Sequence, residues 1–539
     1  VSVGDTPAGE ASDLSCSSVS AGIAECIDHV IEGEPIVDNH CAQEGEGEPI
    51  GDRALEDVVE AKGPKVTAAT ARLGTAPMGS LLLWLCLPTA VSMSVNAFYN
   101  LADSYFIGKF IGDDGLTSIS LISPLEMLLP LALAFMEGVS TGALISVLLG
   151  KNKIQEARLL MGHFMLLGVS LGVLVSLVLL PNMEWILLNV LGCSEEVLPT
   201  ALVYSRVIFL FSPIGYFLIM GTLPLLRVEN RATIAMLAQA TAAILNVIGD
   251  PIFMGALDLG MSGAAVSTSL SQYLVGAFIL WFYLRPKTTS SISPDFKGMV
   301  RGGFRIKNMG RILSNGIGQY VTLLPPTLCA IIGNYQLYKL SDTSRQGDIL
   351  VAANGLAARF ASMLFMPMVG IAQGMGPVLG FNHGQRKGHR MRHATTLGLL
   401  AAHAFTLCVS ILAVLFPEHL AGLFSEDPEV VAVAATMTRY MLGAAWLQSS
   451  VQIANVITQV YHHVWVNVTL ALFRPALIIA MILILPVFMG VDGVWQAFFF
   501  ADLTSGLAGL ALCLWYMSHM VRTSTEQVED TEAEGEGEG

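Results

Sequence analysis

Acidic side chains lie inside long apolar runs of this sequence, where an ionised carboxylate is costly unless it faces a cavity or a partner. Asp103 closes one such run, with Asn100 one helical turn before it on the same face. Asp250 closes a later run, with Asn246 four residues before it, and Thr268 lies in the run that follows. Two carboxylates, an amide and a hydroxyl can offer oxygen ligands to Na⁺ or share a proton. These residue types predict a cation- or proton-coupling site at Asp103, Asn246, Asp250 and Thr268; the alternative is a structural polar clasp between helices.

Further polar residues in the apolar runs could line a cavity beside this site. Gln239 lies on the same stripe as Asp250, and Gln272 follows Thr268 by about one helical turn. For all of these residues the alternative is a hydrogen bond that only holds helices together. The predicted cavity-lining residues are Asn100, Gln239, Gln272, Glu126, Glu137 and Asp502.

The apolar runs themselves predict an all-α integral membrane protein. A bilayer core requires about 20 largely apolar residues per helix. Twelve runs meet this length, at roughly 81–108, 116–148, 160–181, 200–224, 233–254, 263–284, 312–337, 351–378, 395–416, 430–459, 470–489 and 494–517.

The chain repeats itself at an offset of about 235 residues. The stretch Pro251 to Gly255 matches Pro486 to Gly490, and basic loops follow both the second and the eighth run. Six runs per copy place both copies in the same orientation, which is a transporter architecture. The repeat predicts a first lobe at 81–284 and a second lobe at 312–517, joined by a basic loop at 285–311.

The second copy of the repeat has apolar residues where the first copy has three of the predicted coupling residues. Leu485 stands opposite Asp250, Met481 opposite Asn246 and Phe498 opposite Thr268. Folding such a lobe therefore does not require these side chains, which favours function over a structural clasp.

Charge is distributed unevenly along the chain. Residues 1–80 carry 15 acidic and 4 basic residues, and residues 518–539 carry 7 acidic residues and 1 basic residue. Both segments have the composition of disordered tails. Alternating loops hold 17 Lys and Arg on one side, with Arg474 counted among them, and 3 on the other. This asymmetry predicts that both termini are cytoplasmic. We expect the membrane to be the plasma membrane.

Other classes of protein are disfavoured. Charged residues make up 13% of the chain, against roughly 25% in soluble proteins. The acidic net charge of −15 argues against nucleic acid as a partner. Motifs for ATP hydrolysis, zinc proteases and serine hydrolases are missing, and the eight cysteines form no CxxC pair. The expectation is a protein that is not an enzyme and uses neither ATP nor a cofactor.

Four stretches, read in order, carry a family resemblance: residues 100–108, 142–150, 245–253 and 260–268. The chain resembles the multidrug and toxic compound extrusion (MATE) transporters from about residue 80 to 517, and within them the prokaryotic branch of DinF and MepA. The resemblance implies a monomer that exports small amphipathic, often cationic, compounds in exchange for H⁺ or Na⁺ by alternating access. It places the coupling ion at Asp103, Asn246, Asp250 and Thr268. Gln319 stands where another branch has an acid, which favours this first-lobe mechanism.

Two other functions remain open from the sequence. One is a flippase for lipid-linked oligosaccharides or lipids, which belongs to the same superfamily but usually has a cationic cavity. The other is a membrane receptor or scaffold that transports nothing. Export of a compound driven by an ion gradient would distinguish the MATE-like exporter from both of these functions.

Overall fold

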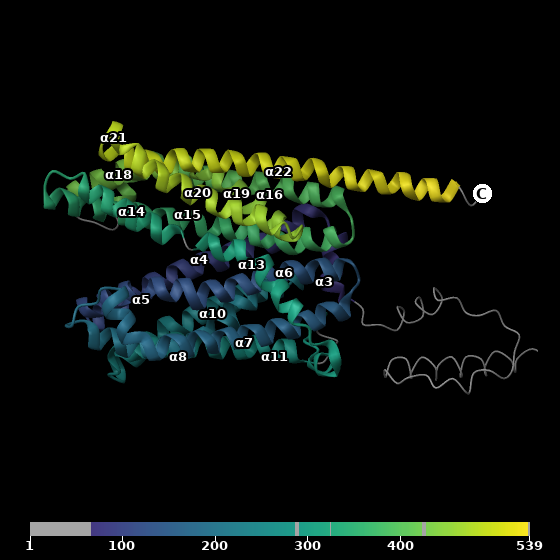
Figure 1. Cartoon of the computed structure of the whole chain (residues 1–539), viewed down its shortest axis with the longest axis horizontal. Helices are drawn as coiled ribbons and strands as arrows, with labels where there is room; N and C mark the ends of the chain where they lie inside the picture. The colour runs from purple at the N-terminus through teal and green to yellow at the C-terminus, as the bar shows by residue number, and fades with distance from the viewer. Residues whose placement is uncertain (1–65, 286–289, 324, 423–426, 537–539) are drawn as a thin grey trace, which may run out of the picture. The chain divides into compact units, whose positions relative to one another are not determined.

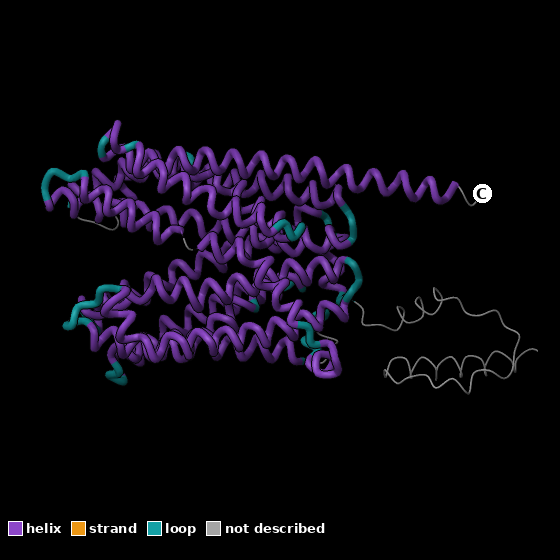
Figure 2. The backbone as a smooth tube through the Cα atoms, viewed as in Figure 1, coloured by secondary structure: helices purple, strands orange, loops and turns teal. Residues whose placement is uncertain are grey.

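The computed structural model describes residues 66–285, 290–323, 325–422 and 427–536. All regular structure in this part of the chain is helical (Figure 2). Twelve helical stretches within it are long and apolar enough to cross a membrane. The all-helical, twelve-span prediction is therefore confirmed.

The first lobe begins after a short helix, α3 (Ala68–Thr75), and Figure 1 draws it in purple to teal. Its helices are α4 (Met78–Phe110), α5 (Asp113–Glu126), η1 (Met127–Leu131), α6 (Ala132–Gly150), α7 (Ile154–Trp185), η2 (Ile186–Val190), α8 (Leu198–Tyr216), η3 (Phe217–Gly221), α9 (Leu223–Val228), α10 (Ala232–Asp250), η4 (Pro251–Ala256) and α11 (Gly260–Leu284).

Short helices α12 (Phe296–Gly298) and η5 (Met299–Gly303) lie in the connection to the second lobe. The second lobe consists of α13 (Ile306–Leu323), α14 (Pro325–Lys339), α15 (Ser344–Gly384), α16 (Gly388–Leu415), α17 (Pro417–Gly422), α18 (Pro428–Gly443), η6 (Ala445–Leu447), α19 (Gln448–Val460), α20 (Val464–Ile484), α21 (Pro486–Met489) and α22 (Val491–Glu536).

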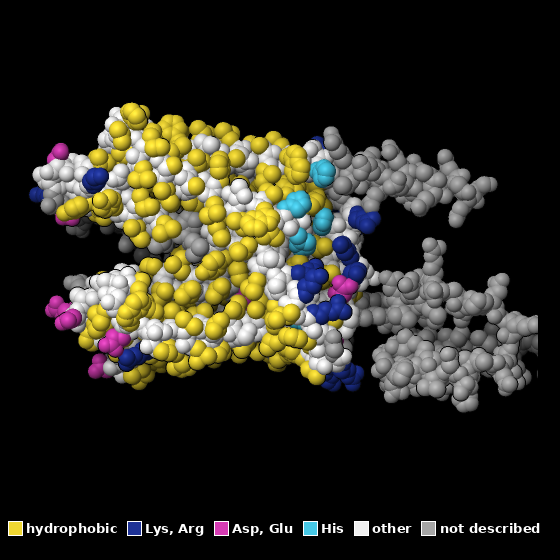
Figure 3. Space-filling model, viewed as in Figure 1, with side chains coloured by type: hydrophobic (Ala, Val, Ile, Leu, Met, Phe, Trp, Pro, Cys, Tyr) yellow, Lys and Arg dark blue, Asp and Glu magenta, His cyan; other side chains and the backbone are white. Residues whose placement is uncertain are grey.

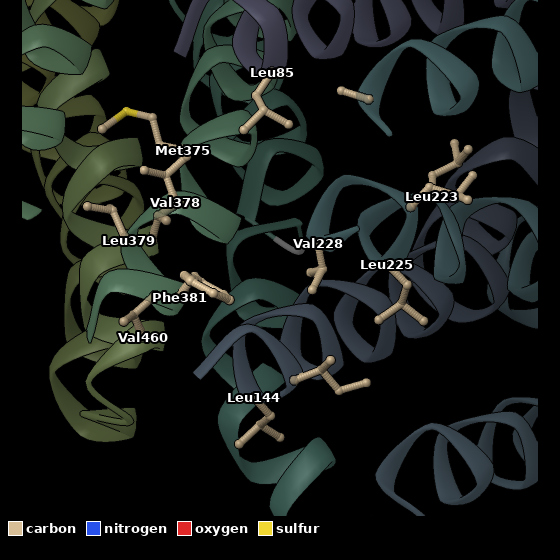
Figure 4. Close-up of a cluster of buried hydrophobic side chains, with 14 of the residues drawn as sticks. Leu85, Leu144, Leu223, Leu225, Val228, Met375, Val378, Leu379, Phe381 and Val460 are labelled. Atoms are coloured by element: carbon tan, nitrogen blue, oxygen red, sulfur yellow. The ribbon is translucent and has the colours of Figure 1, made fainter. Parts of the chain in front are cut away.

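The lobes meet through small residues. Helix α15 of the second lobe packs along α4 and α6 of the first. A Cβ on Gly150 would lie 2.1 Å from the carbonyl oxygen of Phe381, and one on Gly384 would lie 2.3 Å from that of Val147. Only glycine permits such close approach of two backbones. An apolar cluster with members from both lobes, including Leu144 and Val378, surrounds this contact (Figure 4).

Charged side chains mark the two ends of the molecule. Lys, Arg and His gather at the end where the lobes meet, and most visible Asp and Glu gather at the other, with an apolar surface between them (Figure 3). An apolar belt of this kind fits a surface that contacts lipid.

The structure corrects the expectation for part of the N-terminal segment, since residues 68–75 lie inside the predicted disordered tail 1–80 yet form helix α3. Leu73 is fully buried. Asn230 of the first lobe donates to the carbonyl of Ala69 at 3.0 Å. From the second lobe, Asn382 donates to the carbonyl of Leu73 at 3.0 Å, and Arg390 donates to that of Ala76 at 2.8 Å. The helix is therefore bonded to both lobes; residues 1–65 lie outside the described part.

Two other expectations differ from the structure. Helix α22 continues to Glu536, across residues 518–536 of the predicted disordered C-terminal tail. Arg474, counted among the loop residues although the predicted span 470–489 contains it, lies in the third turn of α20, which begins at Val464.

Candidate functional site

Two glycines bring α10 and α11 close enough to form the site. A Cβ on Gly249 would lie 2.5 Å from Ser267 Oγ, and one on Gly263 would lie 2.7 Å from the carbonyl carbon of Phe253. Pro251 follows Asp250 directly, and the α-helical pattern of α10 changes there to the π-helix η4, because proline has no N–H to donate to the preceding turn. The carboxyl of Asp250 therefore lies at the junction of α10 and η4, within a span that is packed against α11.

The amide of Asn246 links the two helices. Its Nδ2 donates to Thr268 Oγ1 at 3.1 Å, to Asp250 Oδ1 at 3.2 Å and to Ser267 Oγ at 3.3 Å. Ser267 Oγ donates back to the carbonyl of Asn246 at 3.1 Å. Asn246 and Asp250 are fully buried and Thr268 is nearly so. Three of the four predicted residues thus form one hydrogen-bonded group.

The fourth predicted residue, Asp103 of α4, joins this group. Its carboxyl lies beside the carboxyl of Asp250, close enough for the two to interact directly. A hydrogen bond between two carboxyls requires a proton on one of them, and two ionised carboxylates at this range require a cation. Among the described residues, Asp103 Oδ1, Asp250 Oδ2 and Asn246 Oδ1 are buried without a hydrogen-bond partner. We call the group of Asp103, Asn246, Asp250, Ser267 and Thr268 the acid nest.

Residues that the sequence analysis did not select surround the acid nest. Tyr99 is 3.5 Å from Thr268 through the two hydroxyl oxygens. Tyr216 donates to Glu126 Oε1 at 2.8 Å, and Glu126 is close enough to interact electrostatically with Asp103. Tyr99 precedes Asp103 by four residues, so helical spacing could have identified it. The contact of Tyr216 with Glu126 spans 90 residues and leaves no trace in local spacing.

A small pocket within the first lobe adjoins the acid nest. It is lined by Tyr99, Tyr216, Gln239 and Gln272, so both predicted glutamines face the same hollow. Gln239 donates weakly to Asn96 at 3.5 Å. The side-chain oxygens of both glutamines lack a partner among the described residues. The side chain of Asn100 lies outside the described part of the structure.

The remaining predicted residues lie elsewhere. Glu137 is buried on α6 and lines a separate hollow with Gly168 and Phe217. Asp502 lies on α22 and forms an ion pair with Arg474, with 2.5 Å between Asp502 Oδ1 and Arg474 Nε. The second lobe therefore neutralises its buried acid with a cation. In the first lobe, Asp103 lies near two other acids, Asp250 and Glu126.

Apolar packing replaces the acid nest in the second lobe. Phe498 is buried in the apolar cluster of this lobe, and Met481 and Leu485 pack against the same cluster. Within the described residues, no group of three His, Cys, Asp or Glu side chains could hold a metal ion.

Comparison with known proteins supports this architecture. A family model described as MatE matches residues 88–252 and 335–487, one segment in each lobe. The multidrug export protein MepA of Staphylococcus aureus (strain MSSA476) is 22% identical over 454 residues, which cover 84% of this chain and 97% of that protein.

Solved structures share the fold. The outward-facing conformation of a multidrug resistance MATE family transporter of the MOP superfamily matches with a TM-score of 0.78 and 23% identity, covering 85% of this chain and 100% of that one. A MOP superfamily transporter from Pyrococcus furiosus, described as having a binding pocket of reverse polarity that suggests a different function, matches with a TM-score of 0.76 and 24% identity. It is covered to 99%, and this chain to 85%.

Proposed function

Because the chain belongs to the MATE family of membrane transporters, we propose that it exports small amphipathic, often cationic, compounds in exchange for H⁺ or Na⁺. The coupling ion would bind at the acid nest, through Asp103, Asn246, Asp250 and Thr268. The observation that carries this proposal is the adjacent pair of carboxyls, Asp103 and Asp250, in the first lobe. In the second lobe, the residues that match Asp250, Asn246 and Thr268 are apolar and belong to or pack against an apolar cluster. The relative MepA is a multidrug export protein, which supports the class of substrate.

The acid nest suits an ion that must bind and leave. Its carboxyls are shielded from water yet have oxygens without partners among the described residues. A proton shared by Asp103 and Asp250 would satisfy one of these oxygens, and Na⁺ would draw on several of them together. Coupling follows if the ion and the exported compound prefer different arrangements of the lobes.

We assign the polar groups of the pocket beside the acid nest to the transport route. Gln239 and Gln272 would line the route between the nest and the exported compound, and Tyr99 and Tyr216 connect that pocket to the acids. Glu126 would add a third carboxyl to the route. Glu137 and Asp502 lie away from this pocket, and we assign them to packing within their lobes.

The proposal also covers the orientation of the chain in the membrane and its oligomeric state. The clustering of Lys and Arg at the end where the lobes meet supports a cytoplasmic placement of that end, and with it of both termini, in the plasma membrane (Figure 3). Both lobes belong to one chain, so a monomer would contain the complete transport path.

The test is export of ethidium from vesicles, with a pH gradient and a Na⁺ gradient imposed separately. We expect one gradient to drive export by the parent, and Asp250→Asn to abolish it. Asp258→Asn is the matched control, since Asp258 is exposed on the connection between the same two helices. Export by Asp250→Asn at the parental rate would refute the acid nest as the coupling site. A folded parent that exports nothing under either gradient would favour the lipid-linked flippase.

A further inference from the structure

Arg227 is a buried cation whose charge is not balanced. It lies at the end of α9 and is 1% exposed. All three guanidinium nitrogens lack a hydrogen-bond partner among the described residues, and no acid in this part of the chain interacts with it. Other arginines inside the fold have partners: the half-buried Arg474 pairs with Asp502, and the buried Arg158 donates to the carbonyl of Ser291 at 3.0 Å.

Arg227 lines a small pocket between the lobes. The walls follow the internal repeat, since Val228 and Arg227 of the first lobe are matched 232 residues later by Val460 and Gln459 of the second. Figure 4 labels the two valines among the apolar side chains at this interface. The repeat pairs Val228 with Val460 but Arg227 with Gln459. The positive charge of Arg227 therefore has no match at the corresponding position of the second lobe.

The lining of the pocket is mostly apolar, and its polar members, Arg227, Gln373 and Gln459, suit an anion. Gln373 and Gln459 contribute amides to the pocket, and the Nε2 atom of Gln459 donates to Gln319 at 3.4 Å, which leaves its second N–H for another acceptor. A guanidinium presents several N–H donors in a planar fork that matches the oxygens of a carboxylate, sulfate or phosphate. A charged group held out of water without a partner is unfavourable, so this pocket requires an occupant with acceptor atoms.

We propose that the pocket between the lobes binds a small free oxyanion through Arg227, with the amides of Gln373 and Gln459 as further donors. This site is distinct from the acid nest and does not depend on the proposed exchange of cations. Because both lobes supply its walls, the bound anion stabilises the arrangement in which the lobes meet at this end.

Binding of radiolabelled sulfate to the purified full-length protein, in nanodiscs of neutral lipid, tests the proposal. We expect saturable binding that unlabelled phosphate and acetate displace. Arg227→Gln should weaken it by about tenfold or more, because charge-assisted hydrogen bonds are lost. Arg305→Gln removes an exposed positive charge and should leave binding unchanged.

A second variant protects the test against misfolding of Arg227→Gln. A Cβ on Gly376 would lie 3.7 Å from Val456 Cγ1, so Gly376→Leu should fill part of the pocket and weaken binding while Arg227 stays in place. No saturable sulfate binding by the folded parent would overturn the proposal and leave water as the partner of Arg227. Equal binding by parent and Arg227→Gln would also overturn it. Loss of sulfate binding only in nanodiscs that contain phosphatidylglycerol would assign the pocket to a lipid headgroup instead of a free anion.

Discussion

The ion pair between Arg474 and Asp502 offers a quantitative test of how the second lobe tolerates a buried acid. Asp502 is 1% exposed and Arg474 is 26% exposed at the side chain. Removing one partner of a buried pair costs about 3–5 kcal/mol, because the other charge stays buried without compensation. Since Arg474 keeps about a quarter of its exposure, we expect Asp502→Ala to lower the free energy of unfolding by about 3 kcal/mol, the low end of that range.

The double variant Asp502→Leu with Arg474→Met separates this charge effect from packing. Both charges are then absent, and Met can pack against Phe365, whose ring lies 5.3 Å from the Arg474 guanidinium carbon. Replacing a buried pair by apolar residues of similar volume is often neutral or stabilising. We therefore expect a free energy of unfolding within about 1 kcal/mol of the parent, measured by SDS titration in mixed micelles.

Ethidium export by the same proteins provides the functional readout. The double variant should export at the parental rate, because the pair acts within the second lobe. Instability of the double variant equal to that of Asp502→Ala would refute the electrostatic reasoning. Stability with loss of export would instead place Asp502 on the transport path, as the sequence suggested.

Two further predictions concern close packing and pH. Gly249→Ala should lower export and cost about 1–3 kcal/mol of unfolding free energy by forcing α10 away from Ser267, whereas Gly79→Ala, with open space around it, should not; equal stability of the two would contradict this packing argument. His462 lies in a connection between spans, where burial, and then the charge of Arg311, lowers its pKa below the usual 6.5. Its neutral form is therefore favoured by folding, so stability is complete above about pH 6.5 and falls as the pH drops towards the lower folded value. His462→Asn, which suits the left-handed φ of 57° there, should flatten thermal stability measured between pH 7 and pH 5; an unchanged slope would exclude His462 as its source.

Helical spans and the core of the acid nest could be read from the sequence because they depend on local spacing. Asn246 and Asp250 are four residues apart and face the same way in any helix. The position of Arg474 could not be read in this way, since its partner is 28 residues distant and a single charge makes a long apolar helix look like a shorter one. The unpaired state of Arg227 likewise depends on which helices surround it.

Helix α3 was missed for a different reason. Its own sequence is short and weakly apolar, and it stands at the end of an acidic segment whose composition dominates any average. Its stability comes from groups that lie far away in the chain, such as Asn230 and Asn382. Tertiary contacts of this kind override local propensity.

Helix α3 connects the two lobes across their interface, because residues of both lobes donate hydrogen bonds to it. The first lobe contributes the hydrogen bond from Asn230, and the second lobe contributes the hydrogen bonds from Asn382 and Arg390. Separation of the lobes at this end must break the hydrogen bonds between α3 and one of the lobes. Helix α3 therefore opposes that motion.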